Sequence, residues 1–273
     1  MQKMLLRLYL VSWLPEKESK IIGFNRGAHC ALYSLTKGDS MENILGVIGG
    51  MGPMASQLFY KIIIGKTDAA KDQEHINMMI LSHATMPDRT DAILSGNTKQ
   101  VYDMLLDDCQ TLEDAGCKAI VIACNTAHYF AHQYTDKLNI PIISMIRETA
   151  KEVGHLYKGQ LIAILATDAT IETKLYQEAL VQEGVVPYIV SAKSQKLIMH
   201  LIYDCVKNGK PSDQLALSHI EEELKSMGCS AALMACTELS VIKEDMALGT
   251  FYIDPMEVLA IKAIEFMGKK VKE

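Results

Sequence analysis

The chain has 273 residues, of which 49% are hydrophobic and 22% are charged, and its formal net charge is -6 at pH 7. This composition is typical of a globular protein and excludes bulk disorder, a collagen-like fibre and a coiled coil. The sequence holds no run of about 18 apolar residues, so it predicts no membrane span. The net acidity argues against a nucleic-acid-binding or anionic-membrane surface, although a few local Arg or Lys side chains can still bind a small anion.

The first forty residues differ from the rest. They carry six basic and three acidic residues and the single tryptophan, Trp13. Their apolar stretch, residues 4–14, is interrupted by Arg7 and precedes no small-residue cleavage site, which disfavours a signal peptide. We interpret residues 1–40 as a leader or an upstream extension that is not part of the fold, with Met41 as the natural start.

From residue 44 onward, apolar segments alternate with amphipathic ones. Expected strands cover residues 44–48, 77–81, 119–123, 140–145, 161–166, 187–190 and 231–235. Expected helices cover residues 54–64, 101–115, 148–156, 171–183, 196–208, 212–227 and 256–267. Strands that are apolar throughout and alternate with helices predict parallel sheets covered on both faces.

An internal similarity suggests two related halves. Residues 115–124 and 227–236 share Gly, Cys, Ala, Ala and Cys in one register, and the strand at 44–48 is echoed at 161–165. Each match ends at the carboxyl end of an expected strand, where open α/β sheets bind ligands. We therefore expect two similar parallel-sheet α/β domains related by a pseudo-two-fold, with the active site in the cleft between them. The first domain would comprise residues 41–142 plus 250–273, and the second residues 143–249.

The chain has seven cysteines, and none forms a CxxC pair. The odd number and the chain length argue against a disulfide framework and a zinc finger. We expect free thiols in a cytoplasmic protein without a bound metal. Most of these thiols would be small buried hydrophobes.

Cys124 and Cys236 stand apart because they end the two matching segments and precede polar residues. Cys124 is followed by Asn-Thr-Ala-His, and Cys236 by Thr-Glu-Leu-Ser. Free backbone N–H groups where a strand turns into a helix favour anions and lower a thiol pKa. Two opposed thiols could remove a proton from one face of a carbon and deliver one to the other face, which inverts it. The alternative is that both cysteines simply fill the core.

Seven motifs span residues 41 to about 258. They are Gly49-Gly50-Met51-Gly52-Pro53, Asp72-Gln73-Glu74-His75, Pro87-Asp88-Arg89-Thr90, Cys124-Asn125-Thr126-Ala127-His128, Pro141-Ile142-Ile143-Ser144-Met145-Ile146, Cys236-Thr237-Glu238 and Asp254-Pro255-Met256. With these motifs the body resembles the aspartate/glutamate racemase superfamily, and within it the cofactor-independent aspartate racemases. Residues 1–40 have no counterpart in this resemblance.

The resemblance implies that Cys124 and Cys236 are the catalytic acid/base pair. The substrate-binding positions that it implies are Met51, Arg89, Asn125, Thr126, Ala127, Lys196 and Thr237. Backbone N–H and hydroxyl groups aimed at the α-carboxylate would stabilise the enediolate-like charge that forms when the α-proton leaves. The resemblance further implies a small amino-acid substrate, no cofactor and a homodimer.

Several residues allow a second interpretation. Arg89 could be a solvated loop charge or pair with Asp88, although its planar fork suits a carboxylate. Lys196 could equally be a solvated residue at the start of a helix. The turn at residues 49–53 lacks the G-x-G-x-x-G order and a following Lys-Ser/Thr, so a phosphate cradle is disfavoured. Glu238 could support Cys236 as a proton-relay neighbour or cap a helix.

His128 is expected to be a structural hydrogen-bonding residue, since the thiols already provide the acid and the base. The function that follows is interconversion of L-aspartate and D-aspartate by a two-base, two-cysteine, PLP-independent mechanism. Alternatives are a glutamate or broad-specificity amino-acid racemase, a small-dicarboxylate isomerase or lyase that uses one cysteine, and a non-catalytic dicarboxylate-binding protein.

Overall fold

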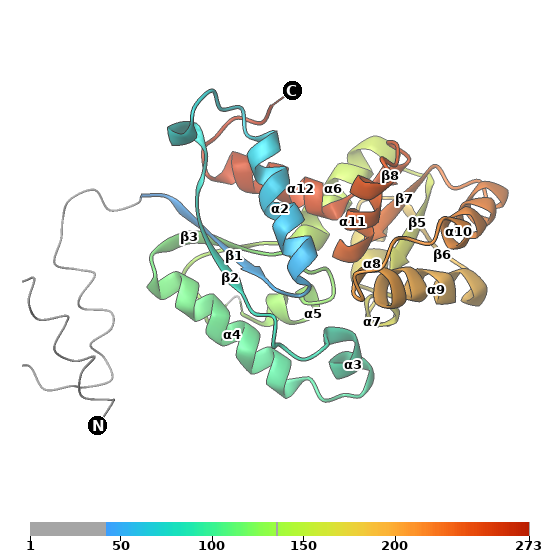
Figure 1. Ribbon diagram of the computed structural model, residues 1–273, viewed down its shortest axis with the longest axis horizontal. Coiled ribbons are helices and arrows are strands. Elements are labelled where there is room, and N and C mark those ends of the chain that lie inside the picture. Colours follow the sequence, from blue (N-terminus) through green and yellow to red (C-terminus); the bar gives the residue numbers. More distant parts are fainter. Residues whose placement is uncertain (1–41, 135, 273) are drawn as a thin grey trace, which may run out of the picture. The chain divides into compact units, whose positions relative to one another are not determined.

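The computed structural model describes residues 42–134 and 136–272. The interpretation of residues 1–40 lies outside this part of the chain. Two four-stranded sheets form its framework (Figure 1). The strands of the first sheet are β1 (Ile44–Gly49), β2 (Asn77–Ser82), β3 (Cys117–Ile122) and β4 (Ile142–Ile143). Those of the second are β5 (Leu161–Ala166), β6 (Val186–Ile189), β7 (Ala231–Ala235) and β8 (Tyr252–Ile253).

The two sheets have the same topology. The first has the order β2-β1-β3-β4 and the second the order β6-β5-β7-β8, and all paired strands are parallel. The third strand in chain order of each sheet, β3 or β7, therefore leads to one of the two motif cysteines. This arrangement confirms the expected pair of similar parallel α/β domains.

Helices connect the strands. The α-helices are α2 (Pro53–Lys66), α3 (Arg89–Leu94), α4 (Lys99–Asp114), α5 (His128–Ala131), α6 (Met145–Tyr157), α7 (Asp168–Glu172), α8 (Leu175–Gln182), α9 (Ala192–Met199), α10 (Gln214–Ser226), α11 (Thr237–Asp245) and α12 (Pro255–Phe266). Two short 3-10 helices, Asp72–Glu74 and His132–Tyr134, and one π-helix, His200–Val206, complete them. No helix in residues 42–134 or 136–272 has the length and apolarity needed to cross a membrane.

Both faces of each sheet are covered, because its strands are apolar on both sides. In the first sheet, Ile48 and Ile120 pack with α4, whereas Leu45 and Val121 pack with α2 and α12 on the opposite face. Figure 1 shows α2 and α12 on one side of this sheet and α4 on the other. In the second sheet, α6 and α8 cover one face and α9 and α10 the other. We call each sheet with its covering helices the first and the second lobe.

The chain crosses between the lobes twice, and a helix cap marks each crossing. Ser144 caps α6 by accepting a hydrogen bond from Arg147 N, and Asp254 caps α12 by accepting one from Met256 N. Helix α6 packs in the second lobe, and α12 returns to the first. Strand β8 falls within the range 250–273 that we expected in the first domain, but it pairs with β7 in the second sheet.

Three expected elements differ in detail. The strand expected at 140–145 is only β4, because Ser144 already starts α6. The helix expected at 171–183 is divided into α7 and α8 at Lys174, which has a φ of 56°. The helix expected from 196 starts at Ala192, where Ser191 caps α9, and continues as the π-helix. The short α3, α5, α11 and β8 were not anticipated.

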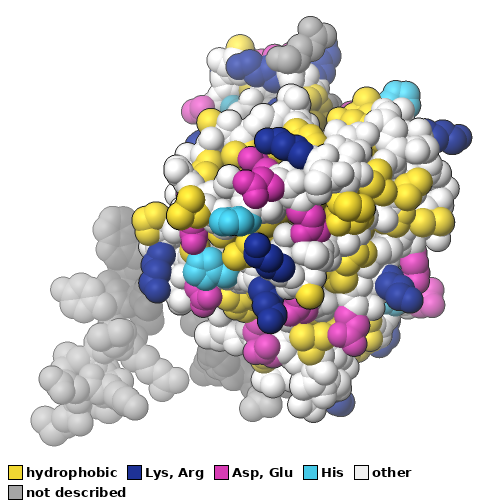
Figure 2. All heavy atoms as spheres, turned by 90° about the vertical axis from the view of Figure 1, so that its right-hand side faces the viewer, with side chains coloured by type: hydrophobic (Ala, Val, Ile, Leu, Met, Phe, Trp, Pro, Cys, Tyr) yellow, Lys and Arg dark blue, Asp and Glu magenta, His cyan; other side chains and the backbone are white. Residues whose placement is uncertain are grey.

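The surface of the second lobe carries mixed charge. Figure 2 shows basic and acidic side chains interspersed on this face rather than grouped by sign. All six cysteines in the described part of the chain are free thiols, as expected, and Cys30 lies outside it.

Candidate active site

The two motif cysteines lie where β3 and β7 end, at equivalent places in the two lobes. Both are buried, with 5% exposure each, and both line one small cavity between the lobes. The first lobe contributes Met51, Asp88, Arg89, Thr90, Cys124, Asn125 and Thr126 to its wall. The second lobe contributes Thr167, Lys207, Cys236, Thr237 and Glu238. The cavity measures about 10 Å³, which is room for about one water molecule.

Most of the expected binding residues meet at this cavity. Met51, Arg89, Asn125, Thr126 and Thr237 all line it. Ala127 is fully buried and precedes α5, but it is not in the cavity wall.

Lys196 is not brought to the cavity. It is exposed on α9, which agrees with the alternative interpretation that this lysine is solvated. Lys207 lines the cavity instead, because the chain continues from α9 through the π-helix toward the first lobe. The basic residue opposite Arg89 is therefore Lys207, which sequence reasoning missed.

Arg89 is buried, with 7% exposure, and is neither solvated nor paired with Asp88. Its Nη1 donates to the carbonyl of Pro87 at 2.9 Å, and its Nη2 donates to that of Met51 at 3.4 Å. Its Nε has no hydrogen-bond partner among the residues that the structure describes. Burial lowers the pKa of Arg89, but negative charge at Cys124, Asp88 and Glu238 outweighs burial and raises it, so the guanidinium stays charged.

Asp88 joins the two lobes next to the cavity. It caps α3 through Thr90 N at 2.8 Å, and its carboxylate also accepts from Lys207 Nζ at 2.9 Å and from the Tyr203 hydroxyl at 3.1 Å. Lys207 Nζ lies 4.1 Å from the centre of the Tyr203 ring. Burial lowers the pKa of Lys207, but Glu238 and Asp88 more than compensate and raise it, which keeps this amine charged.

Glu238 turns its carboxylate toward Cys236. Cys236 Sγ donates to Glu238 Oε2 at 3.0 Å, and Thr237 Oγ1 donates to the same oxygen at 3.4 Å. Burial and the Glu238 charge raise the pKa of Cys236 well above its usual value, so this cysteine is a protonated thiol. Of the two roles considered for Glu238, the geometry favours support of Cys236.

Three threonine hydroxyls meet between the lobes. Thr126 Oγ1 lies 3.1 Å from Thr167 Oγ1 and 3.0 Å from Thr170 Oγ1, and the latter two are 3.1 Å apart. Thr167 and Thr170 come directly after β5, the counterpart of β1. In the sequence, the Thr-x-x-Thr motif after an apolar strand could have identified these two residues. Each hydroxyl can donate once and accept once within this group.

His128 is a buried hydrogen-bonding residue, as the sequence suggested. Its Nδ1 donates to the Cys124 carbonyl at 2.9 Å, and its Nε2 accepts from Met145 N at 3.1 Å. Burial lowers the pKa of His128 to about 4, so the ring is neutral near pH 7. It links the Cys124 backbone to the first crossing between the lobes.

The glycine turn after β1 brings Met51 to the cavity. Gly50 has a φ of 84°, and a Cβ there would lie 2.5 Å from the backbone nitrogen of His83. Its own N–H donates to Ser56 Oγ at 2.8 Å. The turn thus needs glycine for backbone conformation and close approach.

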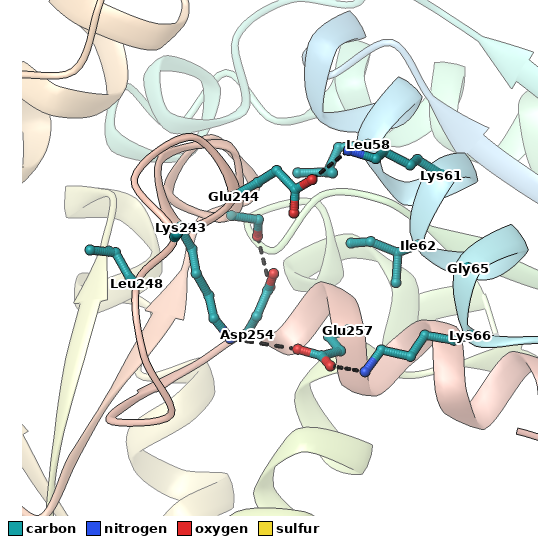
Figure 3. A pocket seen from close by; sticks show the side chains of 12 residues that line it. Leu58, Lys61, Ile62, Gly65, Lys66, Lys243, Glu244, Leu248, Asp254 and Glu257 are labelled. Atoms are coloured by element: carbon teal, nitrogen blue, oxygen red, sulfur yellow. Dashed lines mark hydrogen bonds and ion pairs between the residues drawn. The ribbon is translucent and has the colours of Figure 1, made fainter. Parts of the chain in front are cut away.

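Larger hollows lie outside the cavity. One of about 270 Å³ adjoins it and shares Met51, Asp88, Arg89, Lys207 and Glu238 with its wall. Another, of about 600 Å³, lies between α2, α11 and α12 (Figure 3).

The hollow in Figure 3 lies away from the cysteines, and its charges neutralise one another. Lys61 pairs with Glu244, whereas Lys66 and Lys243 both pair with Glu257. Within residues 42–134 and 136–272, no cluster of three or more His, Cys, Asp or Glu side chains is arranged to hold a metal ion.

Comparisons with known proteins agree with this geometry. The family profile described as Asp/Glu/Hydantoin racemase matches residues 48–263. The broad specificity amino-acid racemase RacX of Bacillus subtilis (strain 168) is 26% identical over 80% of this chain and 95% of its own length. The structure of Picrophilus torridus aspartate racemase superposes with a TM-score of 0.72 at 28% identity, and covers 84% of this chain and 96% of that one. A glutamate racemase of Koribacter versatilis (strain Ellin345) is 26% identical over 50% of this chain and 47% of its own. This chain therefore belongs to the Asp/Glu/hydantoin racemase family and is an amino-acid racemase.

Proposed function

We propose that this racemase interconverts L-aspartate and D-aspartate by a two-cysteine mechanism that needs no pyridoxal phosphate. The observation that carries the proposal is that Cys124 and Cys236, at equivalent strand ends, line one cavity together with Arg89 and Lys207. Thiols from opposite lobes suit proton transfer at opposite faces of a carbon. Two cations in the cavity wall suit a substrate with two carboxylates. The similarity to Picrophilus torridus aspartate racemase supports this substrate.

The surroundings of Cys236 support a resting role for each thiol. Cys236 holds its proton in a hydrogen bond to Glu238, so it is the acid. In a two-base reaction the thiol of the other lobe, Cys124, is then the base. Cys124 takes the α-proton, and the electrons of the broken C–H bond move into the α-carboxylate. The Cys236 thiol then gives its proton to the opposite face of the carbon. Turnover from the other enantiomer runs the same steps in reverse.

The enediolate-like intermediate requires donors at the α-carboxylate. Asn125 Nδ2 is buried at the cavity and has no hydrogen-bond partner among the described residues. The backbone N–H groups at the start of α11 are further donors near Cys236. A carboxylate oxygen in the cavity would satisfy the Asn125 amide at the point where negative charge develops.

Aspartate does not fit into space for about one water molecule, so the described conformation is closed. The contacts of Asp88 with Lys207 and Tyr203 hold the lobes together beside the adjoining hollow. Substrate entry therefore requires these contacts to separate. The adjoining hollow, which shares five wall residues with the cavity, is the route that we propose for entry.

The test incubates the purified protein with L-aspartate in D2O, with reductant and without added cofactor. Proton NMR follows loss of the α-proton, and a chiral assay follows D-aspartate. Parallel tubes hold L-glutamate and a panel of neutral and basic L-amino acids, because one similar protein is a broad specificity racemase. The double variant Cys124→Ser/Cys236→Ser is the control for contaminating activity.

Deuterium incorporation with growth of D-aspartate toward an equal mixture is the expected result. Faster turnover of glutamate or of a neutral amino acid would move the substrate assignment to that compound. Binding of aspartate without exchange would favour a dicarboxylate-binding protein. Inversion or elimination that survives loss of one cysteine would favour an isomerase or lyase.

A further inference from the structure

Tyr176 connects the second lobe to the residue that follows Cys124. It lies in α8, is fully buried, and donates its hydroxyl hydrogen to Asn125 Oδ1 at 2.6 Å. Burial raises the pKa of Tyr176 well above its usual value, so the phenol stays protonated and remains a donor. This hydrogen bond joins residues 51 positions apart and crosses from one lobe to the other.

The contact fixes which end of the Asn125 amide faces the cavity. An asparagine amide has an acceptor oxygen and a donor nitrogen that exchange places when the side chain turns by half a revolution. Because the amide oxygen accepts the hydrogen bond from Tyr176, the amide nitrogen points the opposite way. That nitrogen is buried and has no hydrogen-bond partner within the described ranges, and Asn125 lines the cavity. In the opposite orientation, the amide oxygen would face a substrate carboxylate and repel it.

The local fold of the second lobe brings Tyr176 to this position. The chain breaks at Lys174, with a φ of 56°, between α7 and α8, so Tyr176 lies in the first turn of a new helix. The neighbouring Thr126 is held by the same lobe through Thr167 and Thr170. The loop after Cys124 therefore receives its orientation from α7 and α8 when the lobes are closed.

We propose that Tyr176 is a positioning residue for racemisation, which orients the Asn125 amide so that its NH2 group receives an oxygen of the substrate carboxylate. The inference rests on the proposed function, in which Asn125 binds the substrate. It also makes the carboxylate site a property of the closed conformation, since the donor belongs to one lobe and the residue that orients it belongs to the other.

The test is a double-mutant cycle with Tyr176→Phe, Asn125→Ala and the combined variant. The Phe variant keeps the ring and removes one hydroxyl. We expect it to raise KM for aspartate about tenfold while kcat changes less, since a lost hydrogen bond to a charged group has an effect of this size. Once Asn125 is alanine, the hydroxyl has nothing to orient. The combined variant should therefore have the same KM as Asn125→Ala alone.

Tyr134→Phe is the matched control. Tyr134 is also fully buried, and its hydroxyl donates to the Tyr102 carbonyl at 3.0 Å, within the first lobe and outside the cavity wall. Loss of this hydroxyl should lower the melting temperature and leave KM unchanged. If Tyr176→Phe behaves in the same way, or if its effect on KM adds fully to that of Asn125→Ala, the positioning role is overturned.

Calorimetric binding of succinate, a dicarboxylate with no α-ammonium group, provides a readout that does not depend on turnover. Its Kd should weaken about tenfold in Tyr176→Phe and remain unchanged in Tyr134→Phe. Unaltered binding and KM in an active Tyr176→Phe protein would overturn only the positioning role. A wild-type protein that neither racemises aspartate nor binds succinate would overturn the proposed function and this inference together.

Discussion

Cys236 and Glu238 form a hydrogen bond in which the thiol donates to a carboxylate oxygen at 3.0 Å, within one buried turn at the start of α11. Arg89 and Lys207, from other elements, both interact with the Glu238 charge. The Glu238 charge and burial raise the pKa of Cys236, whereas Lys207 lowers it. Cys236 is thus kept protonated although a cation lines the same cavity.

The first prediction concerns Glu238→Gln. Removing the negative charge lowers the pKa of Cys236, so its thiol ionises at a lower pH than in the wild type. The alkaline limb of the kcat profile, measured with the enantiomer that requires Cys236 as the acid, should move down by about one pH unit. Glu244→Gln, on the exposed end of the same helix, is the control and should leave the profile in place. Identical profiles for both variants would contradict the role of Glu238.

The second prediction separates the two lysines. Lys207→Met removes a cation from the cavity wall and should raise KM for aspartate by about 10- to 100-fold. Lys196→Met changes an exposed residue of α9 outside the cavity wall and should alter KM by less than about twofold. Steady-state kinetics with each enantiomer measures both values. The opposite ranking would restore the assignment that the sequence suggested.

The third prediction uses the two cysteines one at a time. Cys124→Ala and Cys236→Ala should each reduce racemisation at least about a hundredfold, because each removes either the acid or the base. The remaining thiol can still remove and return a proton on its own face. Each variant should therefore exchange the α-proton of one enantiomer in D2O without inverting it, and the two variants should prefer opposite enantiomers. Exchange of the same enantiomer by both would rule out opposed thiols.

The fourth prediction concerns stability. Burial lowers the pKa of His128 to about 4, whereas an unfolded histidine titrates near 6.5. Between these values the unfolded chain binds the proton more readily, so His128 contributes stability above pH 6.5 that is lost as the pH falls toward 4. The contribution is about 3 kcal/mol in the free energy of unfolding.

Urea unfolding at a series of pH values between 4 and 7.5 measures this effect. His128→Gln keeps one donor and one acceptor but does not titrate, so its stability should depend less steeply on pH. His219→Gln is the control, because His219 is exposed and its Nδ1 bonds to Leu215 O of its own helix. Equal slopes for His128→Gln and the wild type would contradict the prediction.

The sequence predicted the fold well because each buried strand carries its own local signal. Segments such as 44–48 and 231–235 are apolar at every position, which a strand covered on both faces requires. Short elements such as α3 and β8 were missed, because a cap or a neighbouring strand stabilises them rather than periodicity. The break at Lys174 was also missed, since nothing in the apolar pattern marks a positive φ there.

The sequence by itself determined the two apolar α/β halves and the matching places of Cys124 and Cys236, because strand ends and repeated segments are local features. Only the tertiary structure decided which lysine lies at the cavity. The path of the helix brings a lysine there, and the residues next to it in the sequence do not indicate this. Only the structure decided between the two roles of Glu238, because side-chain direction turns its carboxylate toward Cys236. Only the structure paired Tyr176 with Asn125, because that contact depends on the closed approach of the lobes, which short-range sequence patterns do not encode.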